Sequence, residues 1–493
     1  MTRHILPQLP VSRSPHRRRQ ALGALVLTLA LASYGTAGHA GPSTDAALAT
    51  GEILDPIATL GEDDETYALY LPEGYTAGSE LRWPILFVLD PRSQGRQAAE
   101  RFKPAAERFG YILVSSNSTR SDLADGTPDP NPGAMVALFR DAMTRFAADE
   151  KRVYLTGFSG TARYAWSVGF GLPGKIAGVI GCGGALPGPF EPWRDVTFAY
   201  FGTAGETDFN HHEMQLLDRD LDATDVAHRF TYFPGGHEWA TPEVLVEALG
   251  WMEVQAMGAG TKQRQDEQLA RLYAEEAAAA RSLEAESPFV ALRRWQQLAR
   301  DFDGLHDTQE AQQAATRLAS ESSVQQMGKA VLEAAEREAS YRQHLDNVLN
   351  QVIGSSPIPP LRSVLRRLRI PQLLERSQLD SLAGISAQRQ LSIAFVNTVF
   401  YRPRILMQTQ DARRAILMLE IAQAVKPDHW RPEISLAVAY AGSGKRAKAL
   451  AALEQAVDAG YANLDFIEQA DELEPLRSEP AYRALVDRLR DDS

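Results

Sequence analysis

The sequence has only one cysteine, Cys182, among 493 residues. Intrachain disulfides and cysteine-ligated zinc sites are therefore excluded. An excess of positive charge is also lacking: the formal net charge is −12, which argues against nucleic acid as the main partner. Beyond the first 40 residues, no run reaches the roughly 18 consecutive apolar residues of a membrane-spanning helix. We therefore expect no stable membrane insertion of the mature chain.

The composition is that of a globular protein, with 44% hydrophobic and 23% charged residues. The length predicts two or three domains, each able to bury a core without disulfides or a structural metal. Because Cys182 lies in an apolar run before Gly183, we expect it to be buried and unreactive.

Residues 1–40 have the pattern of a secretory signal peptide. A basic segment with five arginines and no acidic residue is followed by an apolar run over 21–32. Gly38 and Ala40 then precede a plausible cleavage site at Gly41. The pattern predicts export to the periplasm or secretion. An uncleaved N-terminal anchor is the alternative, although the apolar run is short for one.

From about residue 65 to residue 257, apolar runs alternate with helical stretches, and several of the runs are continuous, as in strands buried on both faces. The expected strands are 66–71, 84–89, 111–115, 153–156, 177–182, 196–201 and 229–233. The clearest expected helices are 95–109, 133–148 and 242–257. Alternation of this kind predicts the α/β class, with a mostly parallel, doubly wound sheet.

The rest of the chain predicts helices without strands: a helical region over 261–350, a linker with helices over 351–410, and a repeat over 411–490. Within the repeat, Ala415, Leu419 and Ala422 recur 34 residues later as Ala449, Leu453 and Ala456. Small residues let paired helices approach closely, and this period resembles the tetratricopeptide repeat. Because fewer than three repeats are rarely stable alone, we expect neighbouring helices to pack against them. The resemblance implies a binding surface, and a peptide, a membrane partner and the chain's own catalytic domain are the alternatives for what it binds.

The strongest chemical signal is Ser159, in the stretch Thr156-Gly-Phe-Ser-Gly-Thr161. A strand leading into a tight turn and then a helix projects a serine oxygen above the sheet edge. The usual pattern, G-x-S-x-G, has glycine where this chain has Thr161. We interpret Ser159 as a nucleophile; an ordinary loop serine is the alternative.

A nucleophilic serine needs a base and an acid that orients the base. Asp208 follows one expected strand, with Glu206 as a rival in the same loop, and His237 follows the next strand in a glycine-rich loop. The order serine, acid, histidine suits this class of sheet. A turn-capping role for Asp208 and a surface role for His237 are the alternatives.

His211, His212 and Glu213 raise the question of a metal site. Adjacent histidines point apart on a helix or a strand, and no H-E-x-x-H spacing is present. We therefore expect no metal, and nothing in the sequence indicates a cofactor.

Residues 50–257 resemble an α/β-hydrolase-fold esterase, of the group that includes polyhydroxybutyrate depolymerase-like and feruloyl esterase-like proteins. The matching stretches are Leu71–Tyr75, Pro84–Asp90, Gly157–Thr161, Gly205–Asn210 and Gly235–Trp239. The resemblance implies that Ser159 is the nucleophile, His237 the general base and Asp208 its orienting partner.

The same resemblance implies an oxyanion hole, with one donor from the backbone N–H of Gly160. The second donor usually comes from an H-G-G-G loop. Here that loop begins Asp90-Pro91-Arg92, and Pro91 has no N–H. The expected second donor is therefore Arg92.

These observations predict an exported serine hydrolase that cleaves small-molecule or polymeric carboxylic esters through an acyl-enzyme. The helical module would serve interaction with a partner or with substrate. A catalytically inactive hydrolase-fold scaffold that acts through its repeats is one alternative, and the unusual loop at Pro91 favours it. A peptidase is the other alternative. The sequence lacks the propeller domain that guards the active site of prolyl oligopeptidases, so we rank the peptidase below the esterase.

Overall fold

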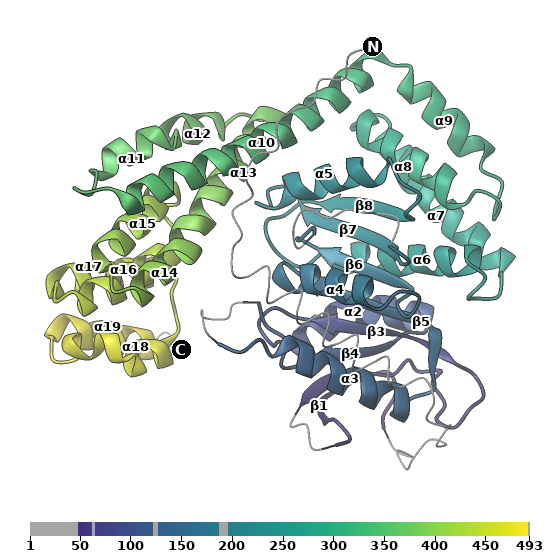
Figure 1. Cartoon of the computed structure of the whole chain (residues 1–493), viewed down its shortest axis with the longest axis horizontal. Coiled ribbons are helices and arrows are strands. Elements are labelled where there is room, and N and C mark those ends of the chain that lie inside the picture. The colour runs from purple at the N-terminus through teal and green to yellow at the C-terminus, as the bar shows by residue number, and fades with distance from the viewer. Residues whose placement is uncertain (1–47, 62–64, 122–126, 187–195, 492–493) are drawn as a thin grey trace. The chain divides into compact units, whose positions relative to one another are not determined.

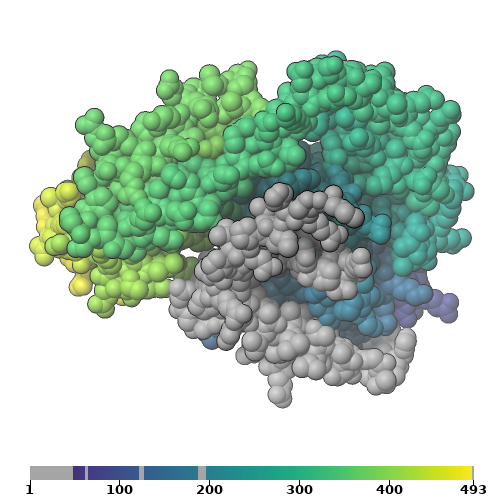
Figure 2. Space-filling model, turned by 45° about the horizontal axis from the view of Figure 1, so that its top comes forward, coloured from purple at the N-terminus to yellow at the C-terminus, as the bar shows by residue number. Residues whose placement is uncertain are grey.

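The structure is a computed structural model that describes residues 48–61, 65–121, 127–186 and 196–491, which are coloured in Figures 1 and 2. The predicted signal peptide lies outside these residues. The chain forms two compact units: unit 1 comprises the residues up to Glu206 and Glu213–Lys329, and unit 2 comprises Thr207–His212 and Ala330–Ser493. Within the described ranges, no helix is long and apolar enough to cross a membrane.

Unit 1 is built on an eight-stranded sheet in the order β1-β2-β4-β3-β5-β6-β7-β8 (Figure 1). The strands are β1 (Ile53–Ala58), β2 (Thr66–Tyr70), β3 (Trp83–Leu89), β4 (Ile112–Ser116), β5 (Ala148–Phe158), β6 (Gly178–Cys182), β7 (Ala199–Gly205) and β8 (His228–Phe233). Strand β2 is antiparallel to both neighbours. The other strands from β4 to β8 in this sheet order, including β3, are parallel to one another. The predicted α/β class with a mostly parallel sheet is confirmed.

Helices cover both faces of this sheet (Figure 1). Helices α2 (Gly95–Phe109) and α6 (Pro242–Gly258) share one core with Leu86 and Val88 of β3. Helices α3 (Asn131–Arg145), α4 (Gly160–Gly171) and α5 (His211–Leu221) share the other core with Ile85 and Phe87. Successive strand residues point to opposite faces, so the continuous apolar runs of the sequence serve both cores at once.

Strand β1 is the element of the sheet that the sequence did not predict. It holds Asp55 and Pro56, is only partly buried, and pairs with β2 across an irregular register. Proline is tolerated at a sheet edge because a missing N–H there leaves no ladder partner unpaired. An edge strand of this kind lacks the apolar run that marks the other seven.

Three helices of the predicted 261–350 region belong to unit 1, together with the sheet: α7 (Asp266–Leu283), α8 (Pro288–Asp301) and α9 (Gln309–Ala319). Their apolar faces form one core with the end of α6, in which Val254 and Met257 join Leu269, Trp295 and Phe302. These helices therefore complete unit 1 and are not a separate module.

Unit 2 is helical. The boundary with unit 1 falls within α10 (Ser322–Gly354). The elements that follow are α11 (Leu361–Arg367), α12 (Ile370–Arg376), α13 (Leu382–Val396), η2 (Asn397–Tyr401), α14 (Arg402–Gln408), α15 (Ala412–Val425), α16 (Trp430–Gly442), α17 (Arg446–Asp458), α18 (Leu464–Gln469), η3 (Asp471–Leu476) and α19 (Pro480–Asp491). The six alanine and leucine positions of the 34-residue repeat lie on α15 and α17, and all six are buried in the core of this unit.

Candidate active site

Ser159 sits between the last residue of β5, Phe158, and the first residue of α4, Gly160. Its backbone has φ 56° and ψ −117°, a left-handed conformation that side-chain-bearing residues rarely adopt. The Ser159 N–H donates to the carbonyl of Cys182 at the end of β6, at 2.8 Å. The strained turn that the sequence predicted is therefore present and is fixed to the neighbouring strand.

Two glycines make this turn possible. A Cβ atom on Gly157 would lie 2.4 Å from the carbonyl oxygen of Thr161, and one on Gly160 would lie 2.4 Å from the Cβ of Ser121. Neither position has room for a side chain. Gly160 is also the first residue of α4, so its N–H has no acceptor within the helix and lies at the positive end of the helix dipole.

Thr161 has a role that the sequence did not reveal. Its side chain is completely buried, and its hydroxyl lies 2.5 Å from the carbonyl oxygen of Leu89, at the end of β3. The same hydroxyl oxygen accepts the N–H of Phe158 at 3.1 Å. Threonine at the usual glycine position therefore joins the turn to the central strand.

His237 is brought directly to Ser159. Its Nε2 lies 2.9 Å from the Oγ of Ser159, although the two residues are 78 positions apart in the chain. The imidazole packs on the ring of Phe158, with centroids 4.6 Å apart. The chain thus supplies a hydroxyl within hydrogen-bond distance of a base, which is the geometry that a serine nucleophile requires.

Asp208 lies in the loop after β7, and His237 lies in the loop after β8. These two strands are parallel neighbours, with Gly205 paired to Phe233 at their ends. Asp208 is 0% exposed, and its Oδ1 accepts the N–H of Asn210 at 2.7 Å. Glu206, its rival from the sequence, is exposed. Burial therefore favours Asp208 over Glu206 as an orienting acid.

The expected second oxyanion donor, Arg92, is engaged elsewhere. Its N–H donates to the Oδ1 of Asp90 at 2.8 Å, and the N–H of Gln94 donates to the same oxygen at 3.1 Å. This hydrogen bond weighs against Arg92 as an oxyanion donor, because the carboxylate at position 90 attracts the N–H groups of this loop; the assignment stays a prediction. The signal in the sequence was an aspartate at the end of a strand, where an Asx turn is common.

His211, His212 and Glu213, which raised the question of a metal site, lie at the start of α5. Both histidines are buried, and the Glu213 carboxylate forms an ion pair with Arg163 of α4. In the described part of the chain, the group with metal-compatible spacing is a different one: Asp218, Asp222 and His228.

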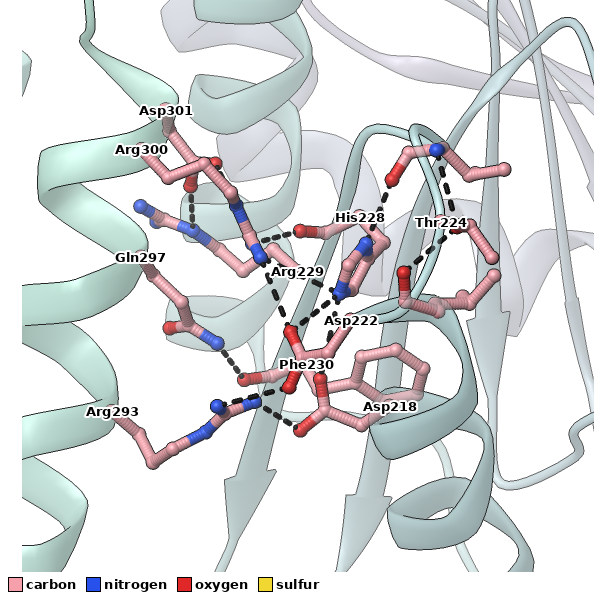
Figure 3. Close-up of polar contacts among 12 residues, drawn as sticks. Asp218, Asp222, Thr224, His228, Arg229, Phe230, Arg293, Gln297, Arg300 and Asp301 are labelled. Atoms are coloured by element: carbon pink, nitrogen blue, oxygen red, sulfur yellow. Dashed lines mark hydrogen bonds and ion pairs between the residues drawn. The ribbon is translucent and has the colours of Figure 1, made fainter. Parts of the chain in front are cut away.

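That group already contains cations from α8 (Figure 3). Arg293 donates to Asp218 at 2.8 Å and to Asp222 at 3.1 Å. Arg300 approaches Asp222 at 3.5 Å and donates to the carbonyl of His228. Burial raises the pKa of Asp218, and the charge of Arg293 partly offsets this effect. The carboxylates are therefore balanced by guanidinium groups, and the cluster joins α8 to α5 and β8.

A deeper ion network surrounds Arg229 on β8, whose side chain is 2% exposed. Its guanidinium contacts Asp301 of α8 at 3.0 Å, Glu276 of α7 at 3.2 Å and Glu247 of α6 at 3.6 Å. Burial raises the pKa of the Glu276 carboxyl. One buried cation thus connects the edge strand to three helices.

Neither a protein-family model nor a curated protein matches the chain. Similar solved structures include fluorophosphonate-binding serine hydrolase F of Staphylococcus aureus, at 15% identity and TM-score 0.34, covering 41% of this chain and 99% of its own. A ferulic acid esterase matches at 15% identity and TM-score 0.34, and the match covers 41% of this chain and 97% of the esterase. The S-formylglutathione hydrolase of Staphylococcus aureus matches at 14% identity and TM-score 0.32, covering 42% and 98%. The fold assignment itself rests on the chain's own strand order and on the turn after β5, which fit the α/β-hydrolase fold.

Proposed function

We propose that the protein is a serine hydrolase that cleaves carboxylic esters through an acyl-enzyme. The observation that carries this proposal is the 2.9 Å contact between the Oγ of Ser159 and Nε2 of His237, at a turn with a strained backbone. Strain of this kind persists where the surrounding structure fixes it, and it is common at active sites.

Each residue has a distinct task in this mechanism. The Oγ of Ser159 attacks the ester carbonyl while Nε2 of His237 takes its proton. Asp208 orients His237 and stabilises the imidazolium. The N–H of Gly160 donates to the oxyanion at the N-terminus of α4. His237 then protonates the leaving alcohol, and a water molecule activated by the same imidazole hydrolyses the acyl-enzyme. No step requires a metal or a cofactor.

The proposal extends to location and partners. The basic and apolar pattern of residues 1–40 supports export to the periplasm or secretion. The buried repeat positions on α15 and α17 support a tetratricopeptide-like arrangement in unit 2, which would bind a protein partner or a polymeric ester substrate.

One observation favours a second candidate, a catalytically inactive scaffold. The N–H of Arg92 donates to Asp90, so the loop after β3 does not present it as a second backbone donor to the oxyanion. The N–H of Gly160 is then the donor that remains. Loss of one such donor typically costs about 10²–10³ in rate. A missing donor therefore predicts slow turnover, whereas the scaffold candidate predicts no turnover.

The test is turnover of short-chain p-nitrophenyl esters by the purified chain. Ser159→Ala and His237→Ala should each lower kcat by about 10⁴-fold or more, with little change in melting temperature. Ser167→Ala is a matched control, because this serine lies on the same helix and its hydroxyl donates only to the carbonyl of Arg163. Turnover by Ser159→Ala equal to wild type would contradict the proposal. A folded wild-type chain without turnover would support the scaffold.

A further inference from the structure

Asp90 is a buried acceptor of hydrogen bonds from two separate loops. It follows β3 and is 5% exposed. Its Oδ1 accepts the N–H groups of Arg92 and Gln94, within its own loop. Its Oδ2 accepts the indole Nε1–H of Trp239 at 3.0 Å. The carboxylate therefore joins the loop after β3 to the loop after β8.

Trp239 lies two residues after His237 and belongs to the same aromatic group. Its ring packs on Phe158, with centroids 5.6 Å apart, and lies perpendicular to the ring of Phe102, with centroids 5.8 Å apart. Phe158 in turn packs on the imidazole of His237. A shift of Trp239 would therefore move both the backbone and the ring packing that hold the base.

Only an ionised carboxylate satisfies this set of donors. Asp90 receives three N–H groups on its two side-chain oxygens. An ionised carboxylate only accepts hydrogen bonds, whereas an asparagine amide has one accepting oxygen and one donating NH₂ group. In Asp90→Asn, the NH₂ group must face either the loop N–H groups or the indole N–H. A buried donor that faces another donor is costly.

The loop of Asp90 is also fixed from a third side. Its backbone carbonyl accepts the hydroxyl of Thr119 at 3.0 Å, and Ser93 within the loop has a left-handed φ of 61°. The N–H of Ser93 donates to the carbonyl of Thr119 at 3.1 Å. These hydrogen bonds hold the loop of Asp90 in place. The bond from Trp239 to Asp90 therefore fixes the histidine loop relative to β3.

We propose that Asp90 is a positioning residue for the hydrolase reaction: through Trp239 it sets the placement of His237 against Ser159. The proposal rests on the proposed function, because the reaction that it affects is the one at Ser159. It predicts that Asp90 and Trp239 act as one unit in catalysis. Misplacement of a reacting group by about 1 Å costs up to about a hundredfold in rate, which sets the scale of the effect.

The experiment is a double-substitution cycle on ester turnover. Trp239→Phe removes the donor but keeps the ring, and we expect kcat to fall about tenfold. Asp90→Asn should lower kcat about a hundredfold, because it places a donor against a donor. The double variant should recover to about tenfold below wild type, since Trp239→Phe removes the conflict; independent effects would give about a thousandfold loss. KM should stay within about twofold in every variant, because neither side chain is proposed to contact substrate.

Trp251→Phe is the matched control. Trp251 is a buried tryptophan of α6, and its indole N–H has no hydrogen-bond acceptor among the described residues. Its substitution should leave kcat unchanged within about twofold. Melting temperatures of all variants show whether a loss of rate reflects loss of folding. If Asp90→Asn does not fold, Trp239→Phe alone still tests the proposal by its fall in kcat at constant KM.

The outcomes separate the two proposals. Losses that multiply in the double variant, or a kcat for Trp239→Phe equal to wild type, would overturn the positioning role and leave the proposed hydrolase intact. An inactive wild-type chain would overturn both. Recovery of the double variant relative to Asp90→Asn, with KM unchanged, supports the coupling.

Discussion

Replacement of Arg229 by methionine should destabilise unit 1 strongly. Methionine keeps much of the side-chain volume but removes the most buried cation beside Asp301, Glu276 and Glu247. Arg294 and Arg300, which are more exposed, still contact these carboxylates. Loss of one partner from a buried ion pair typically costs about 3–5 kcal/mol, and the remaining pairs with Arg294 and Arg300 favour the lower end of that range. For a unit of this size, each kcal/mol lowers the melting temperature by about 2–4 °C. We therefore expect a fall of roughly 10 °C.

The loss should also depend on pH. Burial already raises the pKa of Glu276 in the folded chain, and removal of Arg229 raises it further. A carboxyl with a raised pKa binds more protons in the folded state than in the unfolded state. Its contribution to stability therefore falls as the pH rises above the ordinary pKa of a glutamate. The Arg229→Met variant should therefore lose more stability at pH 8 than at pH 5.

Thermal unfolding monitored by circular dichroism at both pH values is the assay, with Arg108→Met as the control. Arg108 also joins the sheet region to α7, through Glu275, but both side chains are substantially exposed. An exposed pair is worth about 0–1 kcal/mol, so the control should melt within a few degrees of wild type. Equal melting temperatures for Arg229→Met and Arg108→Met would refute this reasoning.

Three further predictions concern the turn at Ser159 and the neighbouring strand β6. Thr161→Val keeps the shape but leaves the carbonyl of Leu89 without its hydroxyl partner, and chemical denaturation should show a loss of about 1–3 kcal/mol; an unchanged midpoint would mean that the hydroxyl does not matter. Ser159→Gly should be about 1 kcal/mol more stable than Ser159→Ala, because glycine tolerates a φ of 56°, and the reverse order in the same assay would argue against strain. Burial raises the pKa of Cys182 to about 12, so iodoacetamide at pH 8 should alkylate the unfolded but not the native chain; rapid labelling of native protein would contradict the buried placement.

Most strands of the sheet could be predicted from local sequence patterns. The apolar runs of β3, β4 and β6 predicted buried strands, and α2 begins and ends at the residues that the sequence predicted. The serine turn could be anticipated because a strand, two glycines and a helix follow one another within a few residues. Strand β1 was missed because its proline and its partial exposure remove the apolar signal.

Long-range contacts were the part that the sequence could not predict. Arg229 and Asp301 are 72 residues apart, and no local pattern indicates that they meet in the core of unit 1. The same holds for Asp90 and Trp239, which are 149 residues apart. The hydrogen bond from the Arg92 N–H to Asp90 was likewise not predicted, because the resemblance to other hydrolase loops does not include a carboxylate at this position.

The most direct test of the central claim is labelling of the purified chain with a fluorophosphonate probe, followed by mass spectrometry of the modified peptide. Such probes react with a serine that is activated by a base and supported by an oxyanion site. We predict a single modified residue, Ser159, with no labelling in Ser159→Ala and much slower labelling in His237→Ala. A folded wild-type chain that does not react, or that reacts at another residue, would contradict the account.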